Sequence, residues 1–369
     1  MVTERQARMA LCALTPLGQP NVVKALGEFG AVELWRGFLA QPETSWGRRA
    51  VAVDVAQLER ATQGCGSRFL MPGDEEWPAS LAGLSGVEVT AQTGEPIGLW
   101  VKGRPLTELG GGVAIVGSRA CTTYGEHAAV TFAADLGMQD RPVISGLAYG
   151  VDAAAHLGVL GVRGTTVAVV ASGVDEPYPV ANARLAQRIV EAGALVSELP
   201  PGYRPTRYAF LARNRIIAAL ADAVVVVEAA ARSGAKNTAS WANALGRHVL
   251  AIPGPITSSL SATPHKLIRD GEAILATSAD DVLAVLSPLG TVGEPSGRGK
   301  DRPIDQLPLP LMEIREAVGA REQLSAAQLS ARTGQSMMDA LAHAAELVES
   351  GWLEEASGLF SLPGRQREG

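Results

Sequence analysis

The sequence predicts an α/β protein built on a Rossmann-like, doubly wound parallel sheet. Two observations lead to this prediction. Short β-branched runs recur between residues 108 and 286, and alanine-rich helical segments alternate with them. Strands that are apolar on both faces and alternate with helices are typical of a parallel sheet covered on both sides. The predicted strands are Val113–Val116, Val143–Ser145, Thr165–Ala171, Ala194–Ser197, Ala223–Glu228 and His248–Ile252.

Smaller regions flank this sheet. The apolar residues Val23, Leu26 and Phe29 recur at helical spacing after a break at Gly18 and Pro20, which predicts a small helical (SAM-like) domain. A stretch rich in Pro, Gly and charge predicts a linker near the C-terminus. The expected parts are a helical domain at 1–65, a connector docking on the central domain at 66–107, the Rossmann-like domain at 108–287, the linker at 288–307 and a winged-helix domain at 308–365.

The winged helix is predicted from three helical stretches followed by a strand pair that turns at Ser357–Gly358. Winged helices often bind duplex DNA through a recognition helix, here Gln335–Glu349. This helix has three acids, Asp339, Glu346 and Glu349, and no Lys or Arg. We therefore favour a protein-interaction or structural role for this domain.

Composition excludes several classes of protein. The 369 residues have a formal net charge of −6, which argues only against indiscriminate DNA binding, because a local basic groove is compatible with an acidic chain. Three widely spaced cysteines and five scattered histidines form no disulfide framework or metal motif. No signal segment or membrane-length apolar run is found, so we expect a soluble cytoplasmic protein without a metal.

The segment Tyr203–Arg215 concentrates four arginines, two tyrosines and one phenylalanine, with no acid among them. Guanidinium groups suit phosphate oxygens, and aromatic faces stack on bases. The segment therefore indicates a phosphate or nucleic-acid surface. The alternative, a solvated loop whose arginines pair with nearby acids, stays open at this point.

Ligands of an open parallel sheet bind at the carboxyl ends of its strands. Loops at these ends combine glycines, small hydroxyls and cations. The candidate residues outside the basic segment are Gly117, Ser118, Arg119, Ser145, Gly146, Ser233, Gly234 and Lys236. The last of these loops also contains Arg232 and Thr238. In the first of these loops we expect backbone amides and the following helix N-terminus to receive an anion.

Catalytic patterns are missing from the same loops. The chain has neither GxGxxG nor the Walker A pattern, and no paired carboxylates or nucleophile-and-base set stand out. His156 lies in an alanine-rich helical segment, where a packed histidine is more common than a catalytic base. We therefore expect a binding site, with no enzyme activity and no cofactor.

Six motifs, in order and spacing, resemble the DNA-processing protein A family (DprA, also called Smf). They are GSRACTTYG, SGLAYGVDAAAH, SGVDEPYPVANARLAQRIVEAGALVSELPPGYRP, FLARNRII, VVVVEAAARSG and GRHVLAIPG. The strong part of this resemblance covers roughly residues 66–285. It implies a homodimer, formed through the central domain, that binds single-stranded DNA without sequence preference. The resemblance also implies delivery of that strand to the RecA recombinase in natural transformation and recombination.

The resemblance also implies roles for individual residues. Arg119 is expected to contact the DNA backbone, and Phe210 and Arg207 to lie in the DNA groove. The next polar residues of the motif, Arg213, Asn214 and Arg215, would shape and charge that groove. Lys236 would stand where the Ser-Gly loop of the family approaches the groove.

The chain departs from the family pattern in several places. Leu211 replaces a proline after Phe210, which would make a loop there less rigid. Ala235, Lys236 and Asn237 replace another family run and add charge. The last group puts a family-typical loop, and with it some dimer or ligand detail, in doubt. It consists of Thr263, His265 and Glu272.

Two alternative functions stay open. One is a small-nucleotide sensor or a phosphoribohydrolase-like enzyme on the same fold. Related enzymes use a PGGxGT loop, whereas this chain has SGAKNTA without the glycine pair, so turnover is not expected. The other is a duplex-specific regulator acting through the C-terminal helix, which the acids on that helix disfavour.

Overall fold

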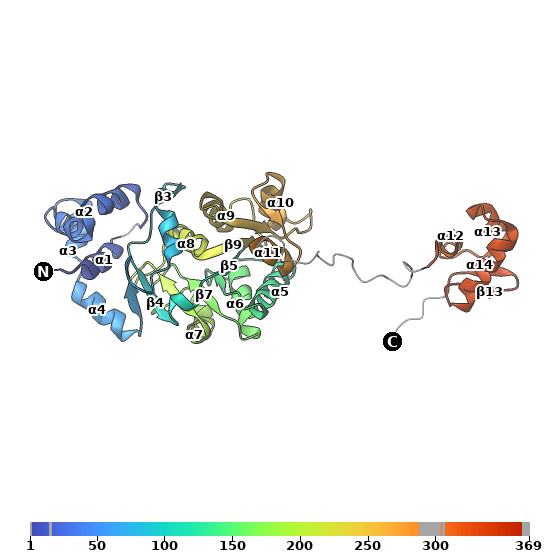
Figure 1. Cartoon of the computed structure of the whole chain (residues 1–369), viewed down its shortest axis with the longest axis horizontal. Helices are drawn as coiled ribbons and strands as arrows, with labels where there is room; N and C mark the ends of the chain where they lie inside the picture. The colour runs from blue at the N-terminus through green and yellow to red at the C-terminus, as the bar shows by residue number, and fades with distance from the viewer. Residues whose placement is uncertain (1, 15–16, 288–303, 305–306, 364–369) are drawn as a thin grey trace. The chain divides into compact units, whose positions relative to one another are not determined.

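The computed structural model describes residues 2–14, 17–287, 304 and 307–363. The chain forms two compact units, Met1–Gly293 and Glu294–Gly369, and each is described by itself (Figure 1). The linker predicted at 288–307 lies outside the described residues, except for Ile304 and Leu307. Within the described ranges, no helix is long and apolar enough to cross a membrane.

A nine-stranded, mostly parallel sheet forms the centre of the first unit. Only the first two strands across it run antiparallel to their neighbours. In order, the strands are β1 (Arg68–Leu70), β4 (Leu99–Gly103), β8 (Ala194–Ser197), β7 (Thr166–Val169), β6 (Val143–Ser145), β5 (Gly112–Val116), β9 (Ala221–Val226), β10 (His248–Ala251) and β11 (Ile274–Leu275). The predicted α/β class is confirmed, and each predicted strand corresponds to one of β5 to β10.

Helices cover both faces of this sheet because its strands are apolar on both faces. In β5, Ala114 and Val116 pack in one core with α8 and α9, whereas Val113 and Ile115 pack in another with α5, α6 and α11. The helices that follow the strands are α5 (Thr123–Met138), α6 (Val151–Gly161), α7 (Ala183–Ala192), α8 (Arg207–Leu220), α9 (Gly234–Ala244), α10 (Ala262–Arg269) and α11 (Ala279–Leu286), with short 3-10 turns η3 (Val180–Asn182) and η4 (Ser259–Ser261).

The strand order reverses at β5. The chain moves from β5 through β6 and β7 to β8 on one side, then returns to place β9 on the other side of β5. The loops that leave the carboxyl ends of β5 and β9 therefore diverge to opposite faces. Such a switch point is where open α/β sheets form a ligand crevice.

The predicted N-terminal helical region contains α1 (Glu4–Cys12), α2 (Pro20–Leu39), α3 (Ser45–Val51) and α4 (Val55–Gly64). Gly30, with φ of +75°, interrupts α2, because a left-handed φ is incompatible with a continuous helix. Leu11 and Trp35 of these helices share a buried core with Phe69 and Trp100 of the sheet edge. This core joins the N-terminal helices to the central sheet.

The predicted connector is partly built into the sheet. Its strands β1 and β4 form the antiparallel edge, with Trp100 of β4 opposite Ser197 of β8. The rest of the connector consists of η1 (Ala79–Leu84), the pair β2 (Glu88–Val89) and β3 (Gln92–Thr93), and η2 (Leu106–Glu108). The connector therefore docks on the central domain by backbone pairing as well as by side-chain packing.

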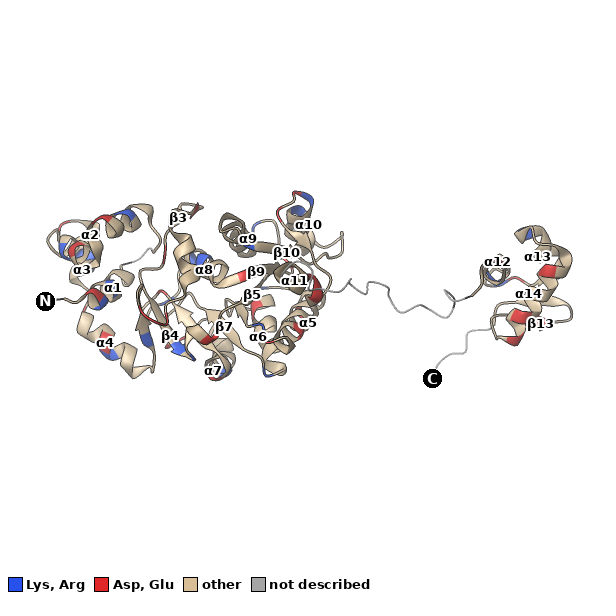
Figure 2. Ribbon diagram, viewed as in Figure 1, with Lys and Arg blue, Asp and Glu red and all other residues tan. Residues whose placement is uncertain are grey.

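The second unit has its own apolar core, which includes Ile314, Leu329 and Leu347. Its chain order is helix, strand, helix, helix and hairpin: α12 (Leu309–Ala317), β12 (Leu324–Ser325), α13 (Ala326–Thr333), α14 (Met337–Glu349), β13 (Glu354–Ala356) and β14 (Leu359–Ser361). The hairpin turns at Ser357–Gly358, where both residues have positive φ as tight hairpins require. Several ribbon segments of this unit have the colour of Asp and Glu in Figure 2.

Candidate nucleic-acid interface

A cleft of about 700 Å³ opens at the carboxyl ends of β5 and β9, at the switch in strand order. Its walls are the loops after these strands and one face of α8, whose cleft residues recur at helical spacing. Most of the residues predicted to contact DNA line it: Gly117, Ser118, Arg119, Arg207, Phe210, Arg213, Asn214, Ser233 and Gly234. The remainder, Ser145, Gly146, Arg215 and Lys236, do not line it.

Three arginines at this cleft, Arg119, Arg207 and Arg232, are exposed. None of them forms an ion pair in the part of the chain that the structure describes, although the Arg119 charge is among those that oppose the raised pKa of the buried Asp152. Unpaired guanidinium groups are available to phosphate oxygens. Sequence reasoning placed Arg232 in a strand-end loop but did not include it among the DNA contacts. The absence of any acid from EAAARSGAKNTA after its first residue was the signal that could have included it.

Phe210 lies on the cleft wall with a guanidinium stacked on it. Cζ of Arg119 is 4.4 Å from the centroid of the Phe210 ring, and Cζ of Arg213 is 6.0 Å from it. The ring of Tyr178 meets Phe210 edge-on, with centroids 5.9 Å apart. A cation over an aromatic face is attracted by the ring quadrupole. A nucleobase, which is also planar, could take the place of the Arg119 guanidinium on this face.

The amino-terminal end of α5 is already occupied by an anion of the chain itself. The buried Glu228 carboxylate accepts hydrogen bonds from the backbone N–H and the hydroxyl of Thr122, at 2.8 and 2.7 Å. The main-chain oxygen of Glu228 accepts the Ser118 N–H at 2.6 Å. This corrects the prediction that backbone amides of this loop and the helix N-terminus receive a ligand anion, and leaves the Arg119 side chain as the loop's cation.

The amino-terminal ends of α8 and α9 have no acid in their first turns. Thr206 and Ser233 cap them, accepting the N–H groups of Ala209 and Ala235 at 3.2 and 3.1 Å. Helix N-termini have a partial positive charge. By contrast, the first turn of α6 contains the buried Asp152. The half of the cleft formed by α8 and α9 is therefore the half that attracts anions.

Arg213 is buried at the floor of the cleft and holds its walls together. Its guanidinium donates to the main-chain oxygens of Gly146 and Val169 and lies 3.7 Å from Asp152. A Cβ at residue 146 would overlap this guanidinium, which explains the glycine. Burial lowers the pKa of the Arg213 guanidinium and raises the pKa of the Asp152 carboxyl, and their mutual attraction opposes both shifts. The geometry favours a structural role for Arg213.

Arg215 faces away from the cleft and is fully buried, at 0% exposure. It pairs with the Glu198 carboxylate at 2.7 Å, and its Nε donates to the main-chain oxygen of Gly94 at 3.0 Å. Asn214 ties α8 to the first residue of α9 by donating to the main-chain oxygen of Gly234 at 3.3 Å. These two residues shape the wall, and their direct contact with DNA stays a prediction.

Two further residues from the strand-end loops and α6 are internal. The Ser145 hydroxyl is buried and donates to the main-chain oxygen of Ile115 at 2.6 Å. His156 is also buried, with Nδ1 2.7 Å from the Thr166 hydroxyl. Desolvation, followed by the nearby Arg213 charge, lowers the pKa of His156 to about 3. A histidine held neutral in the core fits the packing role expected from the sequence.

Leu211 does not sit in a loop. It belongs to α8, which begins at Arg207 and is capped by Thr206, and the Phe210 N–H donates to the Thr206 carbonyl at 3.3 Å. The less rigid loop expected here is therefore a helix. A leucine retains the N–H that a helix interior needs and a proline lacks, so the helix includes Phe210 and sets its direction.

The remaining departures lie in helices or just after one. Ala235, Lys236 and Asn237 belong to α9, Thr263 and His265 belong to α10, and Glu272 follows α10. The Thr263 hydroxyl donates to the main-chain oxygen of Ala230 at 2.8 Å, next to the cleft. His265 Nε2 lies 3.0 Å from the main-chain oxygen of Gly254. The main-chain oxygen of Glu272 accepts a hydrogen bond from Asn243 at 3.0 Å. Thr263 and His265 therefore tie α10 to the loops after β9 and β10.

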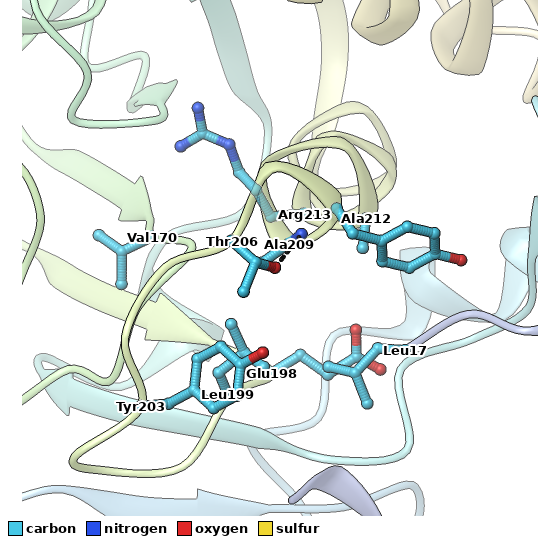
Figure 3. A pocket seen from close by; sticks show the side chains of 10 residues that line it. Leu17, Val170, Glu198, Leu199, Tyr203, Thr206, Ala209, Ala212 and Arg213 are labelled. Atoms are coloured by element: carbon cyan, nitrogen blue, oxygen red, sulfur yellow. Dashed lines mark hydrogen bonds between the residues drawn. The ribbon is translucent and has the colours of Figure 1, made fainter. Parts of the chain in front are cut away.

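A second, smaller cavity of about 110 Å³ lies under the first turns of α8 (Figure 3). Its lining is mainly apolar and includes Leu17, Val170 and Leu199. Figure 3 shows the Arg213 guanidinium pointing away from the other lining side chains. The cavity therefore offers no cation to a phosphate and is separate from the cleft that the exposed arginines surround.

Together, the fold and the cleft define an α/β protein with an anion-attracting, aromatic-containing crevice at its switch point. Among the described residues, no group of three or more His, Cys, Asp and Glu side chains could hold a metal ion. The family model of DNA recombination-mediator protein A matches residues 68–287. The chain therefore belongs to this family, and DNA processing in recombination is the function class that goes with it.

Individual relatives agree with the family match. The chain is 44% identical over 305 residues to the DNA processing protein DprA of Mycobacterium tuberculosis, covering 80% of this chain and 77% of the relative. It resembles the crystal structure of DprA from Streptococcus pneumoniae with a TM-score of 0.60 and 33% identity, covering 77% of this chain and 93% of that one. DprA from Helicobacter pylori, whose structure concerns its single-stranded DNA binding mode, matches with a TM-score of 0.52 and 25% identity, covering 60% and 95%.

Proposed function

We propose that this chain binds single-stranded DNA in the cleft without sequence preference and delivers the strand to RecA in DNA uptake and recombination. The observation that carries the proposal is the set of exposed guanidinium groups at the cleft of Phe210, those of Arg119, Arg207 and Arg232, which form no ion pair among the described residues. A groove of cations with an aromatic platform is the usual design of sequence-tolerant single-strand binders. The single-stranded DNA binding of the Helicobacter pylori relative supports it.

The position of Phe210 favours a single strand over a duplex. A base must leave its stack to lie on an aromatic side chain, and the bases of a single strand do so at little cost. The helix α14 of the second unit is not a basic recognition helix, because it has no Lys or Arg and exposes Asp339, Glu346 and Glu349. We infer that this unit is a winged helix used for protein contact or structure, and that the N-terminal helices form a SAM-like domain.

Other parts of the proposal concern assembly and chemistry. β11 is the last strand of the sheet, and its Ile274 and Leu275 are half-exposed, which supports a homodimer through the central domain.

The cleft has cations and an aromatic ring around a buried, paired carboxylate, an arrangement suited to binding, and we propose that the chain is not an enzyme. A cytoplasmic location goes with this proposal.

A small nucleotide is the competing ligand. The cleft volume of about 700 Å³ is within the usual range for small-molecule sites. Against this ligand, the N-terminus of α5, where nucleotide phosphates commonly bind, is filled by Glu228. A thermal-shift panel of nucleotides set against oligo-dT distinguishes the two: stabilisation by a nucleotide alone would replace the DNA proposal.

The direct test is fluorescence anisotropy of labelled oligo-dT and of its duplex, with a salt titration. We expect salt-dependent binding that prefers the single strand. Arg119→Ala should weaken it and reduce the slope of log K against log salt by about 0.7, the share of one phosphate on a single strand. Phe210→Ala should weaken binding by about 1–3 kcal/mol at an unchanged slope.

Arg163→Ala is the matched control, because Arg163 is exposed just before the amino end of β7, on the sheet edge opposite the cleft. Binding that is lost equally in this control, or not changed in either cleft variant, would contradict the assignment of the cleft. Delivery is tested separately by asking whether the protein accelerates RecA ATPase on oligo-dT that is coated with a single-strand-binding protein. No acceleration would remove RecA delivery and leave DNA binding intact.

A further inference from the structure

Tyr178 is an exposed aromatic residue beside the cleft with no role in the site described so far. It lies in the loop between β7 and α7, is 43% exposed, and has its ring edge against Phe210 at a centroid distance of 5.9 Å. Its hydroxyl has no hydrogen-bond partner in the described ranges. A ring that is neither buried nor held through its hydroxyl is poorly explained as core packing.

The loop nevertheless holds this ring in place. The Tyr178 N–H donates to the buried Ser172 hydroxyl at 3.2 Å, and the next residue, Pro179, is buried. Asn182 fastens the far end of the loop by donating to the main-chain oxygen of Leu147 at 2.9 Å. A pre-positioned aromatic ring loses little conformational entropy when a ligand stacks on it.

Three planar side chains contact one another in series at the carboxyl ends of the strands. Arg119, from the loop after β5, lies over the Phe210 ring, and Tyr178, from the loop after β7, meets the same ring at an interplanar angle of 61°. The loops with Arg119 and Tyr178 follow strands that are two positions apart in the sheet, about two spacings of about 4.8 Å each. Successive bases of a single strand stack on such successive platforms.

We propose that Tyr178 is a second base-stacking subsite, which takes the base next to the one on Phe210 and extends the cleft toward β7. This inference rests on the proposed binding of single-stranded DNA. The charges around Tyr178 orient the strand. Asp175 and Glu176 precede it in its own loop, whereas the exposed Arg204 and Arg207 lie at the start of α8 and have no acidic partner in the described residues. Phosphates therefore run along α8, with bases directed toward Tyr178.

The test compares Tyr178→Ala and Tyr178→Phe with the wild type by anisotropy on oligo-dT. The alanine variant should bind about fivefold or more weakly, which corresponds to the loss of about 1 kcal/mol or more of stacking. Its salt slope should be unchanged, because no phosphate contact is removed. Tyr178→Phe should bind like the wild type. Tyr149→Ala is the matched control, an equally exposed tyrosine (48%) in the loop after β6 without a ring contact to Phe210.

A second readout separates stacking from mere support of Phe210. Oligonucleotides no longer than the binding site, each with one abasic position, should show two adjacent positions at which base loss weakens wild-type binding. In Tyr178→Ala only the position on Phe210 should remain sensitive. If instead the Phe210 position loses its sensitivity, Tyr178 acts through Phe210 and the subsite is overturned.

The inference and the function on which it rests fail in different ways. If Tyr178→Ala binds oligo-dT with wild-type affinity while Arg119→Ala and Phe210→Ala still lose binding, only the proposed subsite is contradicted. If the wild type does not bind oligo-dT, the proposed function itself is contradicted. Urea denaturation of each variant shows that a loss of binding is not a loss of folding, since an exposed ring should contribute little to stability.

Discussion

The two faces of α8 put the same residue type to opposite uses. On the cleft face Arg207 is exposed, without an acidic partner among the described residues, while on the inner face Arg215 is fully buried against Glu198. Both belong to one acid-free segment, Tyr203–Arg215, whose concentration of arginine suggested a single basic surface. The comparison shows that rotation about the helix axis, and not local composition, decides which guanidinium group can meet a phosphate.

Arg213 is intermediate between these two. Its guanidinium is buried and bonded to main-chain oxygens, yet it lines the floor of the cleft and lies near the Phe210 ring. Its guanidinium lies 3.7 Å from the Asp152 carboxylate. After desolvation, its charge is the second cause of the lowered pKa of His156. The inner face of α8 thus forms part of a buried charge network, whereas the outer face presents separate charges to solvent.

The largest expected effect on stability comes from removing the buried ion pair on the inner face of α8. Arg215→Met should lower the free energy of unfolding by about 3–5 kcal/mol, because it leaves the Glu198 carboxylate buried without its partner. Urea denaturation measures this loss. The double variant Arg215→Met/Glu198→Gln should recover part of the stability, since no charge is then stranded. A loss below about 1 kcal/mol in the single variant would contradict a structural ion pair.

A smaller effect on stability is expected when the pH is lowered, because the buried His156 lies near Arg213 in this charge network. His156 has a folded pKa of about 3, below its unfolded value near 6.5, so below pH 6.5 the unfolded chain binds a proton that the folded chain does not. Stability should therefore fall as pH falls through this window, by about 1.4 kcal/mol per unit, or about 2 kcal/mol between pH 7 and pH 5. Urea denaturation at both pH values measures this change.

His156→Asn is the companion variant for that measurement. An asparagine amide can still meet the Thr166 hydroxyl but does not titrate, so the difference in stability between pH 7 and pH 5 should shrink by most of the same amount. A pH dependence equal to that of the wild type would show that other groups, rather than this buried imidazole, produce it.

The smallest effect on folding is expected from the outer face. Arg207→Ala should change the free energy of unfolding by no more than about 0.5 kcal/mol, because the side chain is exposed and has no acidic partner in the described residues. It should instead weaken oligo-dT binding and reduce the salt slope by about 0.7. A stability loss like that of Arg215→Met would erase the distinction between the two faces.

Much of the fold could be predicted because its signals are local. The runs at Val113–Val116 and Ala223–Glu228 are apolar on both faces, and a parallel sheet covered on both sides is the arrangement that satisfies such strands. The connector was harder to predict. β1 and β4 join the sheet through a partner, β8, that is far away in the sequence, and no local pattern reports that pairing.

The candidate site was predictable in outline and not in detail. The loops with Arg119 and Ser233 and the segment with Phe210 do meet at one cleft, because strand-end loops of a parallel sheet share an edge. The prediction that the α5 N-terminus receives an anion failed, because Glu228 occupies it from the end of β9. The sequence of the loop after β5 contains no sign of this carboxylate, because Glu228 comes from a distant part of the chain.

The sequence by itself determined the alternation of strands and helices, the edge of the sheet at which the candidate site lies and the family to which the chain belongs. These depend on hydrophobic period and motif order, which are properties of short segments. Tertiary structure alone decided that Arg207 faces a cleft while Arg215 faces Glu198, that Glu228 binds the N-cap residue of α5, and that Tyr178 meets Phe210. The physical reason is that desolvation and charge pairing depend on which distant groups packing brings within a few ångströms.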